Sequence, residues 1–355
     1  MLDPAKPSAA RFSELQQAYK QAVTTYGPLK DVSGVDIGYK YVDDKRTDDI
    51  AVRVHYRGTS LPKVASFNVL SSFELKPSAL IAFKEKPSGS AGVSGVQFIR
   101  GAYTLHSEPD STKAREKLRD PVQPGLSIAL LKAAGGTLGM IVYDRATGGE
   151  CVLSNAHVLA GLIDAKKDSI IVQPAGNHVA PVAGDANPAI VAKLLRWTMD
   201  VDGDAAVAVL ATKRKVSRAQ YGSSVVVRGT DDPTIGDRVQ KSGVRTLVTD
   251  GFIDGVGRYY LTDDRTGMDG FRIMPLETVD GVPGPADISS AGDSGSVWYR
   301  PVDALGIGLH VGGDATPAHP QGQAAIACSL HTVLTRLNVQ VEKPVPILAN
   351  GVDSA

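Results

Sequence analysis

Residues 136–161 read GTLGMIVYDRATGGECVLSNAHVLAG and contain two apolar runs separated by a turn. The runs TLGMIVYD and ECVLSNA are short, and the turn between them is rich in glycine, which is typical of paired β strands. His157 follows the second run directly, where its side chain would project from the edge of a sheet into a cleft. A single histidine at such a position is more often structural than catalytic, so its role depends on the rest of the chain.

Short apolar runs of the same kind continue from about Leu126 to Val341. The others are LSIALL, SIIVQP, DAAVAVL, SVVVRG, DRVQKSG, GFIDGV, RYYLT, SVWYR, ALGIGLHVGG and AAIACSL. Helices of ten or more residues do not alternate with these runs, and the chain has 37 Gly and 21 Pro. This pattern predicts a mainly β fold of antiparallel barrels or a sandwich, not a parallel α/β sheet.

The residues before Leu126 differ in pattern and predict a separate N-terminal part. Apolar residues recur at helical spacing over 8–26, and VSGVDIGYKYV (32–42) with DDIAVRVHYRG (48–58) alternates like a β-hairpin. We therefore predict a small α+β accessory domain over 1–105. The division continues with a charged, turn-rich linker or exposed strap over 106–125, the β domain over 126–341, which ends in a short helix, and a tail over 342–355.

Composition excludes several classes of function. Lys plus Arg (38) balances Asp plus Glu (38), so no net charge favours nucleic acid or an anionic membrane. We find no apolar leader and no run of about 18 apolar residues, which predicts a cytoplasmic protein. A secreted protein whose leader is missing from this sequence is the alternative. Cys151 and Cys328 lack the spacing of a metal site or a disulfide framework and are expected to be buried fillers.

Three local motifs together point to nucleophilic catalysis. SNAHV supplies His157 as a base, DGDAAVAVL supplies Asp204 at the start of a buried strand, and AGDSGS supplies Ser294 in a glycine-flanked loop. A serine nucleophile needs a base within hydrogen-bond reach and an acid that orients that base. Asp202 and Asp200 compete for the role of the acid, but Asp204 directly adjoins the strand that would hold it in place.

The three motifs resemble those of trypsin-like serine proteases, which have the chymotrypsin fold. The order His, Asp, Ser is the order of that class, whereas α/β-hydrolases have the order Ser, acid, His. The stretches GTLGMIVYDRATGGECVLSNAHVLAG and VQKSGVRT to GDSGSVWY are similar to a branch that includes bacterial proteins and the plant narrow-leaf type, often with an N-terminal extension. The resemblance covers about 126–341 and implies two six-stranded barrels.

The resemblance also implies the other parts of the site. The backbone amides of Gly292 and Ser294 would form the oxyanion hole. A substrate would add as a strand to GLHVGG, at Val311, Gly312 and Gly313. Ile288 would form the apolar floor of the specificity pocket, unless the loop differs by one residue and Asp287 takes that place.

Asp293 raises the question of activation. In the family, the equivalent acid often pairs with an amine that is created when the chain is cut, which would here require a cut in the strap 113–125. The alternative is that internal cations or amides satisfy Asp293 and that the N-terminal part only screens the cleft.

These observations predict a serine endopeptidase that acts on polypeptides and is regulated by its N-terminal domain or by a protein partner. The rival hypothesis is a protease-fold scaffold that binds peptides without turnover. No cofactor is implied, and none of the histidines has the HxxxH or HExxH spacing of a zinc site.

Overall fold

A computed structural model of the chain describes residues 9–42, 45–57, 96–105, 114–161, 165–175, 187–261, 266–276, 287–314 and 323–344. In this part of the chain, strands greatly outnumber helices and form two curled sheets. The predicted mainly β fold with a chymotrypsin-like pair of barrels is thereby confirmed.

The first sheet has the strand order β19-β7-β8-β11-β10-β9-β5-β6. Its strands are β5 (Ser127–Leu130), β6 (Gly136–Thr137), β7 (Met140–Asp144), β8 (Glu150–Ser154), β9 (Ile170–Val172), β10 (Ile190–Asp200), β11 (Gly203–Leu210) and β19 (Val339–Gln340). Alternate residues of β11 point to opposite faces, so Ala205 and Val207 join one buried cluster while Ala206 and Ala208 join another. The strand that carries Asp204 is therefore held by apolar packing on both sides.

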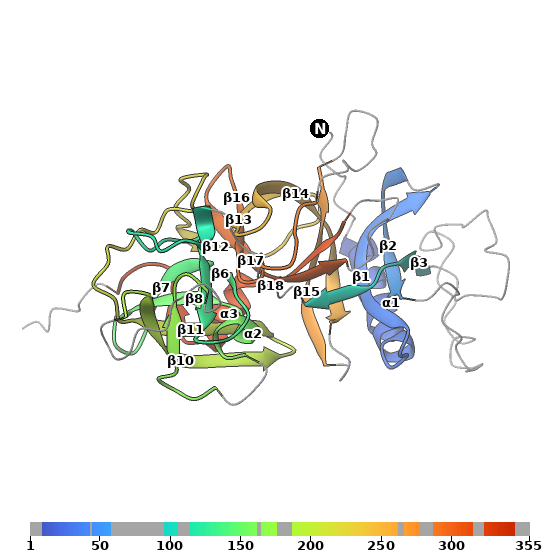
Figure 1. The fold of residues 1–355 in the computed structure, drawn as a ribbon. Coiled ribbons are helices and arrows are strands. Elements are labelled where there is room, and N and C mark those ends of the chain that lie inside the picture. Colours follow the sequence, from blue (N-terminus) through green and yellow to red (C-terminus); the bar gives the residue numbers. More distant parts are fainter. Residues whose placement is uncertain are drawn as a thin grey trace, which may run out of the picture.

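The second sheet has the order β13-β16-β17-β18-β15-β14-β1-β2-β3, with β12 and β4 also paired to β17. Its strands are β1 (Val32–Val42), β2 (Lys45–Tyr56), β3 (Val96–Arg100), β4 (Tyr103–Leu105), β12 (Gly229–Thr230), β13 (Arg238–Gly243), β14 (Leu247–Tyr260), β15 (Gly267–Pro275), β16 (Val297–Arg300), β17 (Leu305–Asp314) and β18 (Ala325–Ser329). Figure 1 shows β14 to β18 between the strands of the first sheet and the N-terminal strands β1 and β2.

The helices are short apart from the first one. They are α1 (Ala9–Tyr26), the 3-10 turn η2 (Ala114–Glu116), α2 (Ala156–Leu159) and α3 (Leu330–Arg336). In the described ranges, no helix has the length and apolar character needed to cross a membrane.

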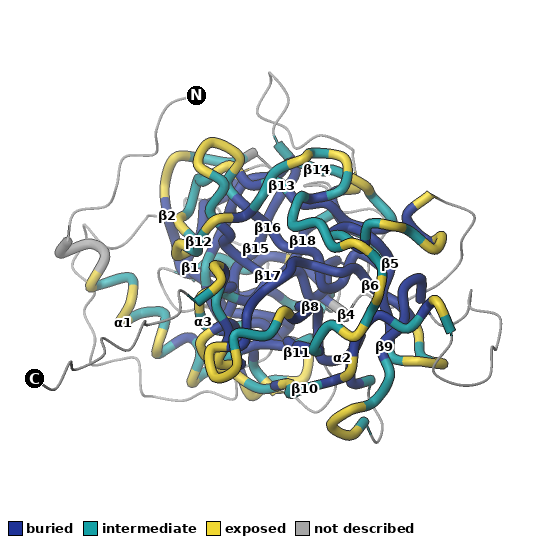
Figure 2. Tube along the Cα trace, turned by 90° about the vertical axis from the view of Figure 1, so that its left-hand side faces the viewer, coloured by how far each residue is buried: buried dark blue, intermediate teal, exposed yellow. Residues whose placement is uncertain are grey.

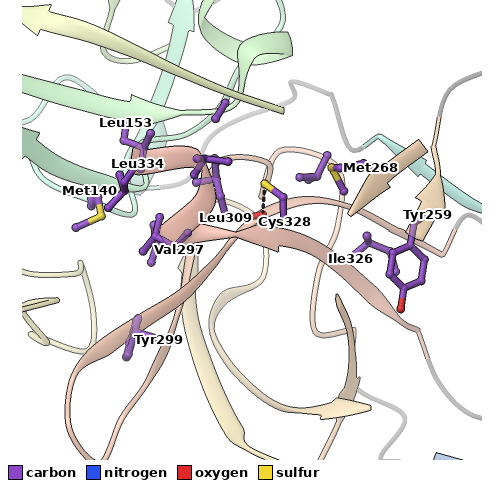
Figure 3. Packing of buried hydrophobic residues seen from close by; sticks show 14 of the residues in the cluster. Met140, Leu153, Tyr259, Met268, Val297, Tyr299, Leu309, Ile326, Cys328 and Leu334 are labelled. Atoms are coloured by element: carbon purple, nitrogen blue, oxygen red, sulfur yellow. Dashed lines mark hydrogen bonds between the residues drawn. The ribbon is translucent and has the colours of Figure 1, made fainter. Parts of the chain in front are cut away.

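A large buried cluster joins the two sheets. Figure 3 shows Met140 and Leu153 of the first sheet close to Val297 and Leu309 of the second, with Cys328 near Leu309. Both cysteines are buried and are not joined in a disulfide, and burial raises the pKa of the Cys328 thiol to about 12. Figure 2 shows the resulting buried centre of the molecule beneath an exposed rim of turns and helix faces.

The N-terminal strands continue the second sheet. β1 pairs antiparallel with β14, so that Gly34 lies opposite Tyr259 and Gly38 lies opposite Gly255. The strands of the predicted accessory domain and those of the second barrel therefore share one hydrogen-bonded sheet. The division at 105 and 125 into separately folding units stays a prediction.

A buried network of charges lies where these parts meet. Arg53 of β2 donates two hydrogen bonds of 2.7 Å to Asp36 of β1, and a third of 2.7 Å to Asp254 of β14. Arg272 of β15 also pairs with Asp254. A side-chain Cβ at Gly38 or Gly255 would collide with the Arg53 guanidinium, which explains the two facing glycines. The network ties the N-terminal strands to the barrel, because removing one partner would leave a buried charge uncompensated.

His55 completes this network. Its Nδ1 is hydrogen-bonded to the Tyr103 hydroxyl at 2.8 Å, and its Nε2 lies 3.0 Å from Asp36 Oδ2. Burial lowers the pKa of His55 below its ordinary value, although Asp36 opposes this shift. Burial alone would raise the pKa of Asp36, but Arg53 and His55 together hold it below its usual range.

We expect stability to fall as the pH falls, in two windows. Below the ordinary histidine pKa of about 6.5, the unfolded chain takes up a proton that folded His55 resists, so stability decreases with acidification. The lowered pKa values of Asp36 and Asp254 stabilise the fold above about pH 4, and this contribution is lost at lower pH. Urea unfolding at pH 7.5, 5.5, 4 and 3 measures both losses, the first between pH 7.5 and 5.5 and the second below pH 4. His55→Asn is expected to make the first loss shallower. An equal loss in that variant would contradict the assignment.

The strand predictions succeeded in most places and failed in others. SVVVRG (224–229), expected as a strand, forms only an isolated bridge at Val226 before β12. β10 and β15 were not expected, because charged residues such as Lys193 and Arg196 interrupt the apolar pattern of β10. GFIDGV and RYYLT, expected as two strands, form the single long strand β14. In addition, each sheet has more strands than the six expected for each barrel.

Candidate active site

His157 is the second residue of α2, which follows β8 after the single residue Asn155. β8 ends at Ser154, and the chain turns into the short helix immediately, so the imidazole leaves the sheet at its edge. His157 is mostly buried, with 8% of its surface exposed.

Asp204 is the second residue of β11, which pairs antiparallel with β8. Its Oδ1 accepts hydrogen bonds from the backbone amides of Ala156 (2.7 Å) and His157 (3.1 Å). Its Oδ2 is hydrogen-bonded to His157 Nδ1. One carboxylate therefore holds both the backbone and the ring of the histidine.

Asn155 also contributes to this arrangement. Its side-chain Nδ2 donates a 2.6 Å hydrogen bond to the backbone carbonyl of Asp204, and Asn155 is fully buried. The helix that carries His157 and the strand that carries Asp204 are thus joined through both the backbone and the side chain of Asp204.

The two other acids of the motif point elsewhere. Asp200 and Asp202 are partly exposed and lie 3.4 Å and 3.5 Å from the guanidinium of Arg336 on α3. The structure brings Asp204, and neither of these two residues, to His157.

Ser294 lies in the turn before β16. Gly292 and Gly295 have φ values of +99° and +88°, which are favourable for glycine and strained for other residues. A Cβ at Gly295 would collide with Ser154 at the end of β8, and a Cβ at Gly136 would be 2.7 Å from the Ser294 carbonyl and 2.5 Å from Val158. These close approaches place the serine turn against β8 and α2, which carries His157.

Thr137 fastens the serine turn to the first sheet. Its amide donates a 2.7 Å hydrogen bond to the Ser294 carbonyl, and its hydroxyl donates a 2.8 Å hydrogen bond to the Gly292 carbonyl. Ser294 is fully buried, and its Oγ donates a 3.1 Å hydrogen bond to the carbonyl of Val311 on β17.

Asp293 is buried and surrounded by donors from within the chain. Its Oδ1 accepts from the Arg245 amide at 2.7 Å, and its Oδ2 accepts from Thr246 Oγ1 at 2.6 Å and from Lys241 Nζ at 3.2 Å. Burial would raise the pKa of Asp293, but Lys241 and these hydrogen bonds outweigh it and hold the pKa below its ordinary value. The serine turn is therefore anchored without a terminal amine.

Replacing Lys241 by methionine is expected to destabilise the protein by about 3–5 kcal/mol, because it leaves the buried Asp293 carboxylate without its cation. Methionine keeps much of the volume of the lysine side chain, so packing changes little. Urea unfolding measures the loss. The matched control adds Asp293→Asn to Lys241→Met, which removes both charges and is expected to recover part of the stability. Wild-type stability in the single variant would show that the ion pair contributes nothing.

The described part of the expected strap is packed at several positions, although Lys117, Leu118 and Asp120 are exposed. Arg115 is buried and donates hydrogen bonds to Ser242 Oγ (2.7 Å) and to the Gly243 carbonyl (2.8 Å), directly before the loop that binds Asp293. Val122 is also buried. Two charges of the segment are buried and have partners within the chain, because Glu116 lies 3.6 Å from Arg245 and Arg115 makes the hydrogen bonds just described. Residues 106–113 lie outside the described residues.

The residues expected to bind substrate lie in two places. Val311, Gly312 and Gly313 are buried in β17, and the first of them provides the carbonyl that accepts from Ser294 Oγ. Ile288 is buried among Val239, Trp298 and Ile307, whereas Asp287 is exposed. The role of Ile288 as the floor of a pocket stays a prediction.

Three residues that hold the site together could not be identified from the sequence: Asn155, Thr137 and Lys241. Each acts through a partner far away in the chain, and local pattern carries no signal for such contacts. Thr137 belongs to the GTLG stretch before β7, and nothing in that stretch distinguishes it from its neighbours. Within the described ranges, no group of three or more His, Cys, Asp or Glu side chains could hold a metal ion.

Comparison with known proteins gives similarity at the level of the fold. No family model matches the chain, and no curated protein matches it. Similar solved structures include a glutamic acid specific serine protease, with 15% identity, 62% of this chain and 100% of that chain covered, and a TM-score of 0.46. Protease A of Thermobifida fusca has 14% identity, coverage of 62% and 98%, and a TM-score of 0.43. The chymotrypsin of Cellulomonas bogoriensis has 15% identity, coverage of 63% and 100%, and a TM-score of 0.43.

These similar structures are serine proteases, the class whose motifs His157, Asp204 and Ser294 resemble. The narrower likeness to the plant narrow-leaf type stays a prediction.

Proposed function

We propose that the protein is a serine endopeptidase in which Ser294 is the nucleophile, His157 the general base and Asp204 the orienting acid. The observation that carries the proposal is the double hold of Asp204 on His157, through the backbone amide at 3.1 Å and through Nδ1 of the ring. A histidine that served only structure would not need its ring and backbone oriented by one buried carboxylate beside a closely packed serine turn.

In this mechanism, Asp204 keeps the proton of the imidazole on Nδ1, which leaves Nε2 to accept the proton of Ser294. The serine Oγ attacks the carbonyl carbon of the peptide, and the amides of Gly292 and Ser294 stabilise the oxyanion that forms. His157 then gives its proton to the leaving amine, and an acyl-enzyme on Ser294 remains. Water hydrolyses this ester by the same route, with His157 again acting as base.

The substrate of the proposed enzyme is a polypeptide that adds as an extended strand to β17 at Val311, Gly312 and Gly313. An apolar residue before the scissile bond is preferred if Ile288 forms the floor of the pocket, and a basic residue is preferred if Asp287 does. The anchoring of Asp293 by Lys241 supports a serine turn that is ordered in the uncut chain. Regulation then belongs to the N-terminal strands or to a protein partner.

A fluorophosphonate probe tests the proposal, because an activated serine displaces its fluoride and becomes phosphonylated. Labelling of the full-length protein that is lost in Ser294→Ala supports the enzyme. A folded wild-type protein that stays unlabelled, also after long incubation, supports the peptide-binding scaffold instead.

A further inference from the structure

The edge of β17 next to Ser294 already has an occupant from the same chain. β17 pairs with β18 on one side, and on the other side β4 pairs antiparallel with its last residues. The register places Leu105 opposite Gly312, Thr104 opposite Gly313 and Tyr103 opposite Asp314. Two of the three residues expected to bind the substrate backbone are therefore paired with β4.

The direction of β4 is that of a substrate. Because the strands are antiparallel, β4 runs from Asp314 towards Gly312, and the next residue of β17 is Val311. The Val311 carbonyl accepts the hydrogen bond of Ser294 Oγ, so the carboxyl end of β4 points to the nucleophile. A peptide substrate must present the residues before its scissile bond in this same direction, since the serine attacks the carbonyl at their carboxyl end.

The start of β4 is anchored in the N-terminal part of the sheet. Tyr103 is fully buried, its hydroxyl is hydrogen-bonded to His55 Nδ1, and its ring packs edge-on against Tyr259 with centroids 5.8 Å apart. Two residues earlier, the Gly101 amide donates a 2.9 Å hydrogen bond to the Tyr56 carbonyl. The strand is thus held at the cleft by β2 and by the buried charges around His55.

We propose that β4 binds the substrate edge of β17 as an intramolecular competitor, so that the full-length chain is inhibited by its own N-terminal segment. This inference rests on the proposed function. It adds Asp314 to the edge that a substrate would use, and it gives the N-terminal strands a role in regulation. A peptide gains the edge only in the fraction of molecules whose β4 has left it, which raises the apparent KM in proportion and leaves kcat unchanged.

Thr104→Pro tests the competition directly. Proline has no amide hydrogen and is excluded from paired strands, so β4 should leave the edge. The matched control is Thr104→Val, which keeps the amide and favours a strand. With a tetrapeptide p-nitroanilide as substrate, and with intact mass showing an uncut chain, we expect the KM of Thr104→Pro to fall by about tenfold or more. The control and the wild type should agree with each other, and kcat should be similar in all three proteins.

Tyr103→Phe provides a milder second variant if the proline disturbs the fold. It removes only the hydroxyl that anchors β4 to His55, and we expect a smaller decrease in KM in the same direction. Fluorophosphonate labelling separates the two hypotheses. If Ser294 is labelled but wild type, Thr104→Pro and Tyr103→Phe have the same KM, self-inhibition is wrong and the proposed function stands. If none of the folded proteins is labelled, the proposed function itself is wrong.

Discussion

Replacing Ser294 by alanine is expected to reduce peptide hydrolysis by about 10⁶-fold, the scale found when a serine protease loses its nucleophile. Alanine removes a single oxygen from a turn that Thr137 and the two flanking glycines hold in place, so the fold should remain. The measurement is the rate of hydrolysis of a peptide substrate, together with thermal unfolding of the same sample. His157→Ala should cause a similar loss, and the double variant should be no slower than either single one, because triad members act as a unit.

Ser290→Ala is the matched control for this prediction. It lies on the same loop, half-buried, and its backbone amide, which the substitution preserves, donates to Asp293 at 3.0 Å. Activity close to that of the wild type is expected. Hydrolysis that survives in pure Ser294→Ala would exclude Ser294 as the nucleophile.

Replacing Asp204 by asparagine is expected to reduce turnover by about 10⁴-fold, as in the analogous acid-to-amide change in a serine protease. The asparagine oxygen can still accept from the amides of Ala156 and His157, so β11 and α2 should keep their places. Its NH₂ group, however, would face Nδ1 of His157 and favour the wrong tautomer, and it cannot stabilise the imidazolium. The comparison of kcat for this variant and the wild type measures the effect.

Asp202→Asn is the matched control, two residues away on the same turn. Asp202 is partly exposed and pairs with Arg336, so turnover should change little. A 10⁴-fold loss in Asp202→Asn with normal turnover in Asp204→Asn would reverse the assignment of the acid.

Local pattern was sufficient where the physics is local. Alternation with a period of two predicted most strands of both sheets, because each strand must bury one face or both. The motif around His157 and the strand start at Asp204 could be paired from sequence, since their chain order restricts the folds that bring a base and an acid together. The hydrogen bond between the two side chains is what the structure adds to that expectation.

Other features could not be predicted, because they depend on partners that are distant in the chain. Arg53 and Asp254 are separated by 201 positions, and each alone looks like a surface charge in an alternating strand. The same holds for Lys241, whose partner Asp293 is 52 positions away. In sequence such residues look solvated. In the fold they link distant segments, because a buried charge is tolerated only next to its counter-charge.

The mainly β fold class could be predicted from the sequence alone, since apolar periodicity and glycine-rich turns depend on neighbouring residues. The three motif residues were chosen from the sequence through their resemblance to trypsin-like proteases. Only the tertiary structure decided that β1 extends the second sheet and that β4 lies along the edge beside Ser294. The physical reason is that main-chain pairing is nearly independent of side-chain identity. Any extended segment can complete a free strand edge, and which segment does so is settled by the packing that carries it there.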